Sequence, residues 1–386
     1  MNPLLHLSET QHAIIDTARE FCAAEVTPFA AQWDRDAHFE PTLVHKLGEL
    51  GFLGMMIPEA YDGLGLDATT YLLALEEISA ADASVGVLMS VHNSLPTQMI
   101  LKYGTEGQKT EFLGPLARGE KLGAFALSEP EAGSDASALR TQALRDGDDW
   151  VLNGTKSWIS AGGHAGVILA MARTDTPDAR RGGKGIGAFI ITPDLEGFKV
   201  GKKENKMGLR ASETVQLVFD NMRVPGDRLL GDASMGFAYA MQSLEAGRLG
   251  IAAQALGIAR AAYEHATAYA RERHQFGKAI GEFQGIQFKL ADMATRIHAA
   301  RSLLHTTAAA KDRGESITEY AAMCKLFATE TAMWVTTQAI QVFGGYGYTT
   351  DYPVERLFRD AKVTEIYEGT SEIQRIVIGR AALKGQ

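Results

Sequence analysis

The 386-residue chain has little of several features that mark particular protein classes. It holds only two cysteines, Cys22 and Cys324, which are too few for a disulfide framework or a cysteine-based metal centre. Its histidines, among them His6, His12 and His38, lack the spacing of metal ligands, so no metal is expected. A net charge of −9 argues against a nucleic-acid-binding surface but is compatible with a local basic pocket.

The sequence also lacks the apolar runs that targeting and membrane insertion require. No run of about 18 apolar residues occurs, so no membrane insertion is predicted. The first residues, MNPLLHLSETQHAIIDTAREF, show neither a secretory signal nor an Arg/Ser-rich transit pattern, and the cytoplasm is the expected location. Neither a G-x-G-x-x-G fingerprint after a strand nor a P-loop is present, so no nucleotide site of either type is expected.

The hydrophobic period changes along the chain. Residues 1 to about 120 follow a helical period that begins at a possible capping box of Ser8 and Gln11. A second helical pattern covers residues 68–95, and the Gly- and Pro-rich stretch 55–67 between the two indicates a loop. An N-terminal all-α domain over residues 1–120 is therefore predicted.

A β pattern replaces the helical one between residues 121 and 225. The segments rich in β-branched and aromatic residues are 123–129, 150–160, 166–174, 187–194 and 213–225. Asn153-Gly154 is a strong signal for a two-residue hairpin turn. Since no helical pattern interrupts these segments, we expect a middle domain that is an antiparallel β-barrel or sandwich.

Longer helical patterns return after Pro225. Helices are predicted over about 235–272, 283–304 and 318–343, the last ending at Gly344-Gly345, and a short helix is predicted after Thr370. Apolar residues of the second helix recur at steps of four and three, as in a bundle: Ile286, Leu290, Met293, Ile297, Ala300 and Leu304. The predicted fold is thus α+β and multi-domain, with a C-terminal four-helix bundle over residues 226–386.

Four segments combine glycine with polar, aromatic or basic side chains, and each has an ordinary structural interpretation as well as a functional one. FALSEPEAGSD (125–135) is either an ordinary surface loop or a loop that offers free hydrogen-bond donors to a ligand. The tryptophan of NGTKSWIS (153–160) either fills the core or stacks on a planar ring. RERHQFG (271–277) carries arginines that complete a helix end or bind phosphate. QVFGGYGY (341–348) is an interhelix turn or a close backbone approach to a ligand.

A fifth segment, VTEIYEGTSEIQR (363–375), places Glu368 between apolar residues. A carboxylate there either caps the following helix or serves as a base. Because Thr370 and Ser371 are themselves good N-cap residues, they can begin the helix and leave Glu368 free for another task.

Together these segments resemble the acyl-CoA dehydrogenase family over nearly the whole chain, and the short-chain and butyryl-CoA members most. The motifs KMGLRASETVQLVFDNMRVP, LEAGRLGIAAQALG and QVFGGYGYTTDYPVERLFRDAKV complete the resemblance in the same order. It implies FAD as the cofactor, acyl-CoA as the substrate, electron-transferring flavoprotein as the electron acceptor, and a homotetramer, or at least a dimer.

The resemblance also implies roles for individual residues. The flavin ring would lie against residues of the β domain, namely Phe125, Leu127, Ser128, Ser134, Trp158, Ile159 and Ser160. The dinucleotide part would contact residues of a neighbouring subunit and of the last helix, namely Arg273, Phe276, Gln284, Gln341, Gly344, Gly345, Thr370 and Glu372. Substrate contacts would come from Ser134, Glu245, Arg248 and Gly369.

In the family the position of Glu368 is that of the base that removes the α-proton of the acyl chain. A minority of members carry the base just before the arginine of LEAGR, where this chain has Gly247, so Glu368 is the expected base. The implied reaction is dehydrogenation to trans-2-enoyl-CoA. Two alternatives remain, an acyl-CoA oxidase on the same fold, which chain length disfavours, and a non-catalytic flavoprotein-like scaffold. Leu88, Met89 and Leu95 are expected to line the acyl pocket, whose length preference stays open.

Overall fold

The computed structural model describes residues 7–174 and 182–384. In its N-terminal part the helices are α1 (Glu9–Phe21), α2 (Ala30–Asp36), α3 (Thr42–Glu49), α4 (Ala68–Ala81), α5 (Ala83–Ser94), α6 (Pro96–Tyr103) and α7 (Glu106–Ala117). A π-helical turn, Cys22–Val26, extends α1. The predicted capping box is present, because Ser8 and Gln11 each bond the backbone N–H of the other.

The helical pattern at 68–95 forms two helices instead of one. Asp82 lies between α4 and α5 in an extended conformation, and its side chain accepts hydrogen bonds from the backbone N–H groups of Ser84 and Val85 at 2.8 and 3.0 Å. An aspartate that satisfies these free donors starts a new helix. Beyond the break, α5 packs against the long helix over residues 236–272.

The β domain is built on one sheet, whose eight described strands run in the order β6-β7-β3-β2-β4-β5-β8 with β1 beside β4. Their bounds are β1 (Leu122–Ala126), β2 (Gln142–Asp146), β3 (Asp149–Ser160), β4 (Ala165–Arg173), β5 (Ile186–Ile191), β6 (Phe198–Lys203), β7 (Thr214–Val224) and β8 (Leu229–Leu230). Most neighbours are antiparallel, while β4 pairs in parallel with β1 and β2.

The hairpin turn predicted at Asn153-Gly154 is wrong. Both residues lie inside β3, and the turn is six residues earlier, at Gly147-Asp148 between Asp146 and Asp149, where Gly147 has a φ of 64°. Gly154 serves a different purpose, because a Cβ there would overlap Thr141 on the neighbouring chain segment. A glycine in a strand often marks such a close approach.

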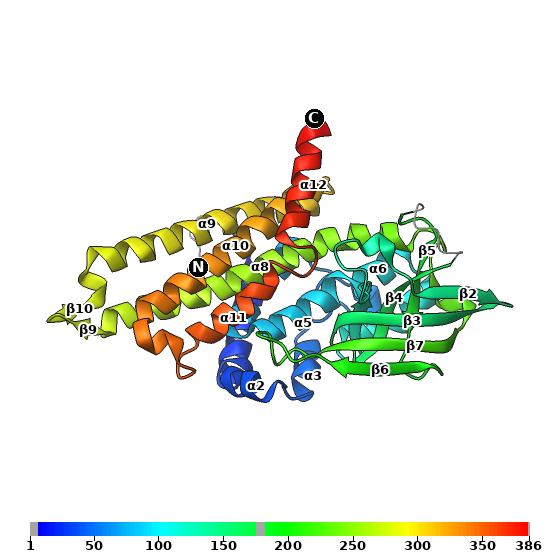
Figure 1. The fold of residues 1–386 in the computed structure, drawn as a ribbon, viewed down its shortest axis with the longest axis horizontal. Helices are drawn as coiled ribbons and strands as arrows, with labels where there is room; N and C mark the ends of the chain where they lie inside the picture. Colours follow the sequence, from blue (N-terminus) through cyan, green and yellow to red (C-terminus); the bar gives the residue numbers. More distant parts are fainter. Residues whose placement is uncertain (1–6, 175–181, 385–386) are drawn as a thin grey trace.

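The C-terminal part is a helix bundle of α8 (Gly236–Glu272), α9 (Gln284–Asp312), α10 (Thr318–Phe343) and α11 (Val354–Thr364), followed by α12 (Ser371–Lys384). A short hairpin of β9 (His274–Gln275) and β10 (Lys278–Ala279) joins α8 to α9. Figure 1 shows this hairpin at one end of the molecule and the β-sheet at the other, with α12 projecting from the bundle between them. The predicted class, with helical, β and bundle domains, is confirmed.

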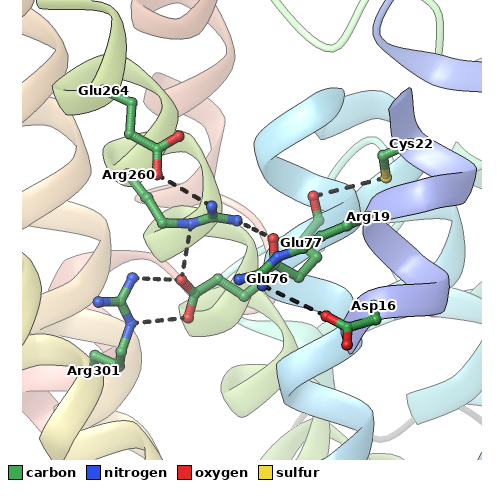
Figure 2. A network of polar contacts seen from close by, with 8 residues as sticks. All are labelled: Asp16, Arg19, Cys22, Glu76, Glu77, Arg260, Glu264 and Arg301. Carbon is green, nitrogen blue, oxygen red and sulfur yellow. Dashed lines mark hydrogen bonds and ion pairs between the residues drawn. The ribbon is translucent and has the colours of Figure 1, made fainter. Parts of the chain in front are cut away.

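A buried ion-pair network joins the N-terminal helices to the bundle (Figure 2). Glu76 on α4 pairs with Arg301 on α9 at 2.5 Å and with Arg260 on α8 at 3.3 Å, while Arg260 also pairs with Glu77 at 2.7 Å. Burial raises the pKa of Glu76, but the charges of Arg301, Arg260 and His305 outweigh it and lower that pKa to about 2. Glu76 is therefore ionised in the folded protein.

One apolar core continues through the same region. Tyr71 and Leu75 of α4 pack with Leu256 of α8 and Ile297 of α9 in a single cluster of buried residues. Because burial of apolar area is the main stabilising contribution, the N-terminal helices and the bundle hold one another in place. Within residues 7–174 and 182–384, no helix is long and apolar enough to cross a membrane.

Candidate active site

Glu368 lies in the turn between α11 and α12, in a left-handed backbone conformation. Its φ is 50°, and that of the following Gly369 is 92°. The cap of α12 is provided by Thr370, whose hydroxyl accepts a hydrogen bond from the N–H of Ile373 at 3.4 Å. Glu368 is consequently free of the capping role that its position also allowed, while Glu372 in the first turn of α12 is exposed.

The Glu368 carboxylate is buried without a hydrogen-bond partner. Both of its oxygens are inaccessible, and neither has a partner among the described residues. Burial raises the pKa of Glu368 to about 7, while the positive charges of Lys325 and Arg248 act in the opposite direction. A buried polar group left unpaired in this way is unusual and points to a ligand or to chemistry.

Helix α8 provides the space for this carboxylate. Gly247 faces it, and a Cβ at that position would overlap Oε2 of Glu368. The next residue, Arg248, is buried, and its Nε has no partner in the described chain. Burial lowers the pKa of Arg248, against the charges of Glu245 and Glu368. Glu245 itself accepts a hydrogen bond from the hydroxyl of Thr318 at 2.7 Å, at the start of α10.

Two polar residues that the sequence reasoning missed support the turn. Lys325 of α10 donates a hydrogen bond to the Gly369 carbonyl at 2.7 Å, and Gln254 of α8 accepts one from the Tyr367 hydroxyl. Both are fully buried. Each is a lone polar residue in an otherwise apolar helical stretch, AAMCKLFA and IAAQALGIA, and that contrast is a signal the sequence offered.

The predicted flavin-ring residues of the first β segment lie at the end of β1. Phe125 is half-buried, Leu127 is buried, Ser128 is half-buried and Ser134 is exposed. The carbonyl of Ser128 accepts a hydrogen bond from the N–H of Ser157 on β3 at 2.9 Å, so the two predicted flavin segments are adjacent. The structure thus brings residues 125–134 and 157–160 together.

A buried ion pair beneath these segments was also missed. Lys156 and Glu129 are 2.7 Å apart, and Glu129 additionally accepts the N–H groups of Arg140 and Thr141 at 2.5 and 2.9 Å. Burial lowers the pKa of Lys156 to about 8, although Glu129 opposes the change. The pair anchors the loop after β1 to β3.

Trp158 stands out of the sheet beside this loop. Its φ is 64°, the β3–β7 register shifts between Lys156 and Ile159, and its indole is 64% exposed. Bulges commonly redirect a side chain in this manner. Ile159 is buried, Ser160 is half-buried, and the buried hydroxyl of Ser157 has no partner in the described part of the chain. An exposed indole beside an unpaired hydroxyl suits a planar ligand with polar edges, such as a flavin.

Apart from Thr370 and Glu372 at the start of α12, the remaining predicted cofactor residues lie at the end of the bundle that carries the β9–β10 hairpin. Arg273, Gly344 and Gly345 line a pocket of about 440 Å³, and the Arg273 guanidinium is 5.4 Å from the centroid of the Tyr346 ring. Gln341, on the last turn of α10, and Gln284, at the start of α9, are exposed. Phe276, at the tip of the β9–β10 hairpin, is 94% exposed.

Within one chain, therefore, the predicted flavin-ring residues of the β domain are separated from the predicted cofactor residues around Arg273. Figure 1 shows the β9–β10 hairpin and the β-sheet at opposite ends of the molecule. One chain alone does not join them, as expected if the second group serves a neighbouring copy.

A second pocket, of about 260 Å³, lies between α3 and the β domain, and it includes Leu88 and Ala161 in its lining. Of the expected acyl-pocket residues only Leu88 reaches it, whereas Met89 and Leu95 are buried elsewhere in the core. Neither pocket includes Glu368. Among the described residues no group of three or more His, Cys, Asp or Glu side chains is arranged to hold a metal ion.

Comparison with known proteins agrees with this arrangement. Residues 8–120, 124–222 and 234–383 match the N-terminal, middle and C-terminal domains of acyl-CoA dehydrogenase. The mitochondrial short-chain specific acyl-CoA dehydrogenase of Rattus norvegicus is 49% identical over 380 residues, 98% of this chain and 92% of that protein.

Two solved structures are similar over 98% of this chain and 99% of theirs, each with a TM-score of 0.96. One is butyryl-CoA dehydrogenase from Megasphaera elsdenii, at 44% identity. The other, at 46% identity, belongs to a structure described as the electron transferring flavoprotein of Acidaminococcus fermentans. The domain limits 1–120, 121–225 and 226–386 remain a prediction.

Proposed function

The chain belongs to the acyl-CoA dehydrogenase family, and on that premise we propose that it converts short-chain acyl-CoA thioesters to trans-2-enoyl-CoA with Glu368 as the base. It is an FAD-dependent oxidoreductase. The observation that carries the assignment of the base is the buried Glu368 carboxylate, which has no hydrogen-bond partner among the described residues.

The first task of the site is to remove the α-proton of the thioester. An ordinary glutamate is a weak base for a carbon acid, with a pKa of about 4.3. Burial raises the pKa of Glu368 to about 7, so its carboxylate binds a proton more strongly and is still substantially ionised at neutral pH. The proton moves from the α-carbon to a carboxylate oxygen of Glu368, and the electron pair of that bond enters the thioester system.

The second task is to stabilise the negative charge that develops on the thioester oxygen. The backbone N–H of Glu368 makes no hydrogen bond to another described residue and is available as a donor. One donor of this kind contributes about 3–4 kcal/mol. The left-handed turn at Glu368 and Gly369 allows the N–H and the carboxylate of one residue to face the same substrate.

Bound FAD supplies the acceptor for the hydrogen that leaves the β-carbon as hydride. Its ring would be held by the loop after β1 and by the Trp158 segment, with the unpaired Ser157 hydroxyl among the polar groups nearby. Its phosphates would contact Arg273 and the residues around it from a neighbouring copy of the chain. The complete site would therefore require a homotetramer, or at least a dimer. Arg273, Gly344 and Gly345 supply a guanidinium and open glycine backbone for that purpose.

The acyl substrate is proposed to be short. The names of the rat and Megasphaera proteins specify short-chain and butyryl-CoA substrates. In this chain, a Cβ at Gly250, one helical turn after Gly247, would be 2.5 Å from Oγ of Ser90. Ser90 of α5 and Tyr71 of α4 thus pack closely against α8 near Gly250, and an acyl chain long enough to extend to this point would have to displace them.

The electron acceptor is proposed to be an electron-transferring flavoprotein. Support comes from the Acidaminococcus structure, whose description names that protein and which contains a chain with the fold of this one. We propose a cytoplasmic location, by analogy with bacterial relatives such as the acyl-CoA dehydrogenase of Bacillus subtilis, which is 48% identical to this chain. The rat relative is mitochondrial.

The decisive measurement is kcat/KM on a panel of straight and branched acyl-CoAs with an artificial electron acceptor. We expect a maximum at short chains and slow reaction of the reduced flavin with O₂. Glu368→Gln should stay yellow and bind acyl-CoA while its flavin is no longer reduced. Normal bleaching of the flavin in Glu368→Gln would show that Glu368 is not the base. Fast oxidation of the reduced wild-type flavin by O₂ would favour an acyl-CoA oxidase. A purified protein without FAD would favour a non-catalytic scaffold.

A further inference from the structure

Lys325 is a lysine that the core accommodates at a cost. It lies on α10, is fully buried, and has no carboxylate within ion-pair distance among the described residues. Burial lowers the pKa of Lys325 to about 8, although the charges of Glu368 and Glu365 oppose the change. Burying a cation without a paired anion is unfavourable, so packing alone does not explain this residue.

Among the residues that the structure describes, the direct partner of the ammonium group is the backbone of the proposed catalytic turn. Nζ of Lys325 donates to the Gly369 carbonyl at 2.7 Å, and Nε2 of Gln374, also fully buried, donates to the same oxygen at 2.8 Å. Gln374 also lies 3.4 Å from the Glu368 carbonyl. Two donors thus occupy the Gly369 oxygen and fix the Gly369–Thr370 peptide, one residue beyond the base.

The turn requires such support because its backbone is strained. Glu368 has a φ of 50°, a left-handed conformation that is unfavourable for a non-glycine residue. Residues held in this region persist where the surrounding structure over-determines them. Lys325 and Gln374 supply that constraint from α10 and α12, on either side of the turn.

The charge of Lys325 has a second consequence. It lies near the Glu368 carboxylate but is bonded to a carbonyl instead, so the carboxylate oxygens stay free for substrate. The other charged or titratable groups facing Glu368 are Arg248 from α8 and Tyr71 from α4, with Tyr367 beside it in the turn. Lys325 is faced by Glu365 and Glu372 in addition to Glu368 and Arg248.

We propose that Lys325 is a positioning residue for the base, which holds the Glu368–Gly369 turn through the Gly369 carbonyl and keeps one positive charge near the carboxylate without pairing to it. A direct ion pair would lower the basicity of Glu368 and cover its oxygens. A neutral residue at position 325 would raise the pKa of Glu368, so its carboxylate would already be protonated at a higher pH. This inference rests on the proposed function, since it assigns Lys325 a purpose only if Glu368 is the base.

The test follows flavin reduction by butyryl-CoA in single turnovers as a function of pH, using the FAD-loaded oligomer. Lys325→Met removes both the hydrogen-bond donor and the charge. The acidic limb of the pH–rate profile should therefore move to higher pH by about one unit, and the plateau rate should fall at least about tenfold. Gln374→Met removes only a donor, so its plateau should fall with the limb in place. Lys325→Arg keeps the charge, and its limb should match that of the wild type.

Lys289→Met is the matched control. Lys289 also makes one hydrogen bond, to Gln338 at 2.6 Å, and also links two bundle helices, but it does not contact the turn. Neither its pH limb nor its plateau rate should change. A purely structural role for Lys325 would lower yield and thermal stability and leave the acidic limb unchanged.

Several results would overturn the inference. An unmoved acidic limb in Lys325→Met would do so, as would failure of both Lys325→Met and Lys325→Arg to accumulate with FAD, since Lys325 would then be needed for folding. The proposed function fails differently, because in that case butyryl-CoA would not reduce the wild-type flavin at any pH.

Discussion

Gly247 on α8 faces the carboxylate of Glu368, which lies in the turn before α12, and the space between them holds only one side chain. A Cβ on Gly247 would overlap Oε2 of Glu368, although the two residues are far apart in the sequence. The absence of a side chain at one position is what allows the carboxylate at the other. The site has room for one carboxylate, and the chain places it at 368.

Gly247→Ala should therefore inactivate the enzyme without unfolding it. The new methyl group must displace the Glu368 carboxylate, and a misplacement of about 1 Å can cost about 100-fold in rate. Single-turnover flavin reduction measures the effect. Gly379→Ala, a helical glycine with no atom within 4 Å of the added Cβ, is the control and should be silent. An unimpaired Gly247→Ala enzyme would mean that the carboxylate lies elsewhere during catalysis.

Moving the carboxylate across the site gives a stricter test of the same geometry. Glu368→Gly combined with Gly247→Glu keeps one carboxylate at the site and should recover part of the flavin reduction that Glu368→Gly alone abolishes. No recovery would indicate that the backbone position of the base matters as much as its carboxylate.

Activity should fall as the pH drops through the neutral range. Glu368 acts as a base only when ionised, and burial raises its pKa to about 7. The sign for stability is opposite, because a carboxyl with a raised pKa favours the folded state at low pH and loses that contribution as pH rises from 4.5 toward 7. Glu368→Gln should thus be relatively more stable than the wild type above neutral pH. Thermal unfolding at several pH values checks this, and identical pH profiles would contradict it.

Lys156→Met should release FAD. Breaking a buried ion pair by removing one partner costs about 3–5 kcal/mol, and here it leaves Glu129, in the loop after β1, as a buried carboxylate without its cation. Spectroscopic titration with FAD measures the loss, which Lys156→Met combined with Glu129→Gln should partly reverse. If FAD affinity stays normal, the pair does not support the flavin loop.

Glu76→Gln should destabilise the contact between the N-terminal helices and the bundle by about 3–5 kcal/mol, because Arg301 would keep a buried, unmatched charge, while Arg260 would still pair with Glu77 and Glu264. The pKa of Glu76 is lowered to about 2, so its contribution is complete above the ordinary value of 4.5 and is lost as pH falls toward 2. Urea unfolding at neutral and acidic pH measures both effects.

Glu264→Gln is the matched control for that experiment. Glu264 pairs with the same Arg260 at 3.3 Å, but its side chain is 57% exposed, so its loss should cost less than about 1 kcal/mol. Equal destabilisation by the two variants would show that burial does not set the strength of the network.

Mixed oligomers should show that the FAD site is shared between subunits. Arg273→Ala should lose FAD affinity, whereas Arg271→Ala, at the exposed end of α8, should not. Co-assembling Arg273→Ala with Glu368→Gln subunits would join an intact Glu368 to an intact Arg273 across an interface. Activity of the mixture above that of either variant is expected, and a mixture with no added activity would place both residues in sites formed within one chain.

Several elements followed directly from local sequence. The period of Ile286, Leu290, Met293, Ile297, Ala300 and Leu304 marks the face of α9 that packs inward, and Gly344 ends α10 as expected. Two local predictions did not hold. Asp82 splits one helical pattern in two, and Gly154 continues a strand where it resembles a turn, because each responds to a partner that its immediate sequence does not display.

The sequence by itself determined the order of the domains, the family and the identity of the proposed base, because hydrophobic period and motif order are local properties of the chain. Tertiary structure alone decided the environment of that base. The overlap of Gly247 with Glu368, the bond from Lys325 to Gly369 and the Lys156–Glu129 pair each join residues distant along the chain or on different elements. Burial and through-space charge, which set the basicity of Glu368, exist only once those elements are packed together.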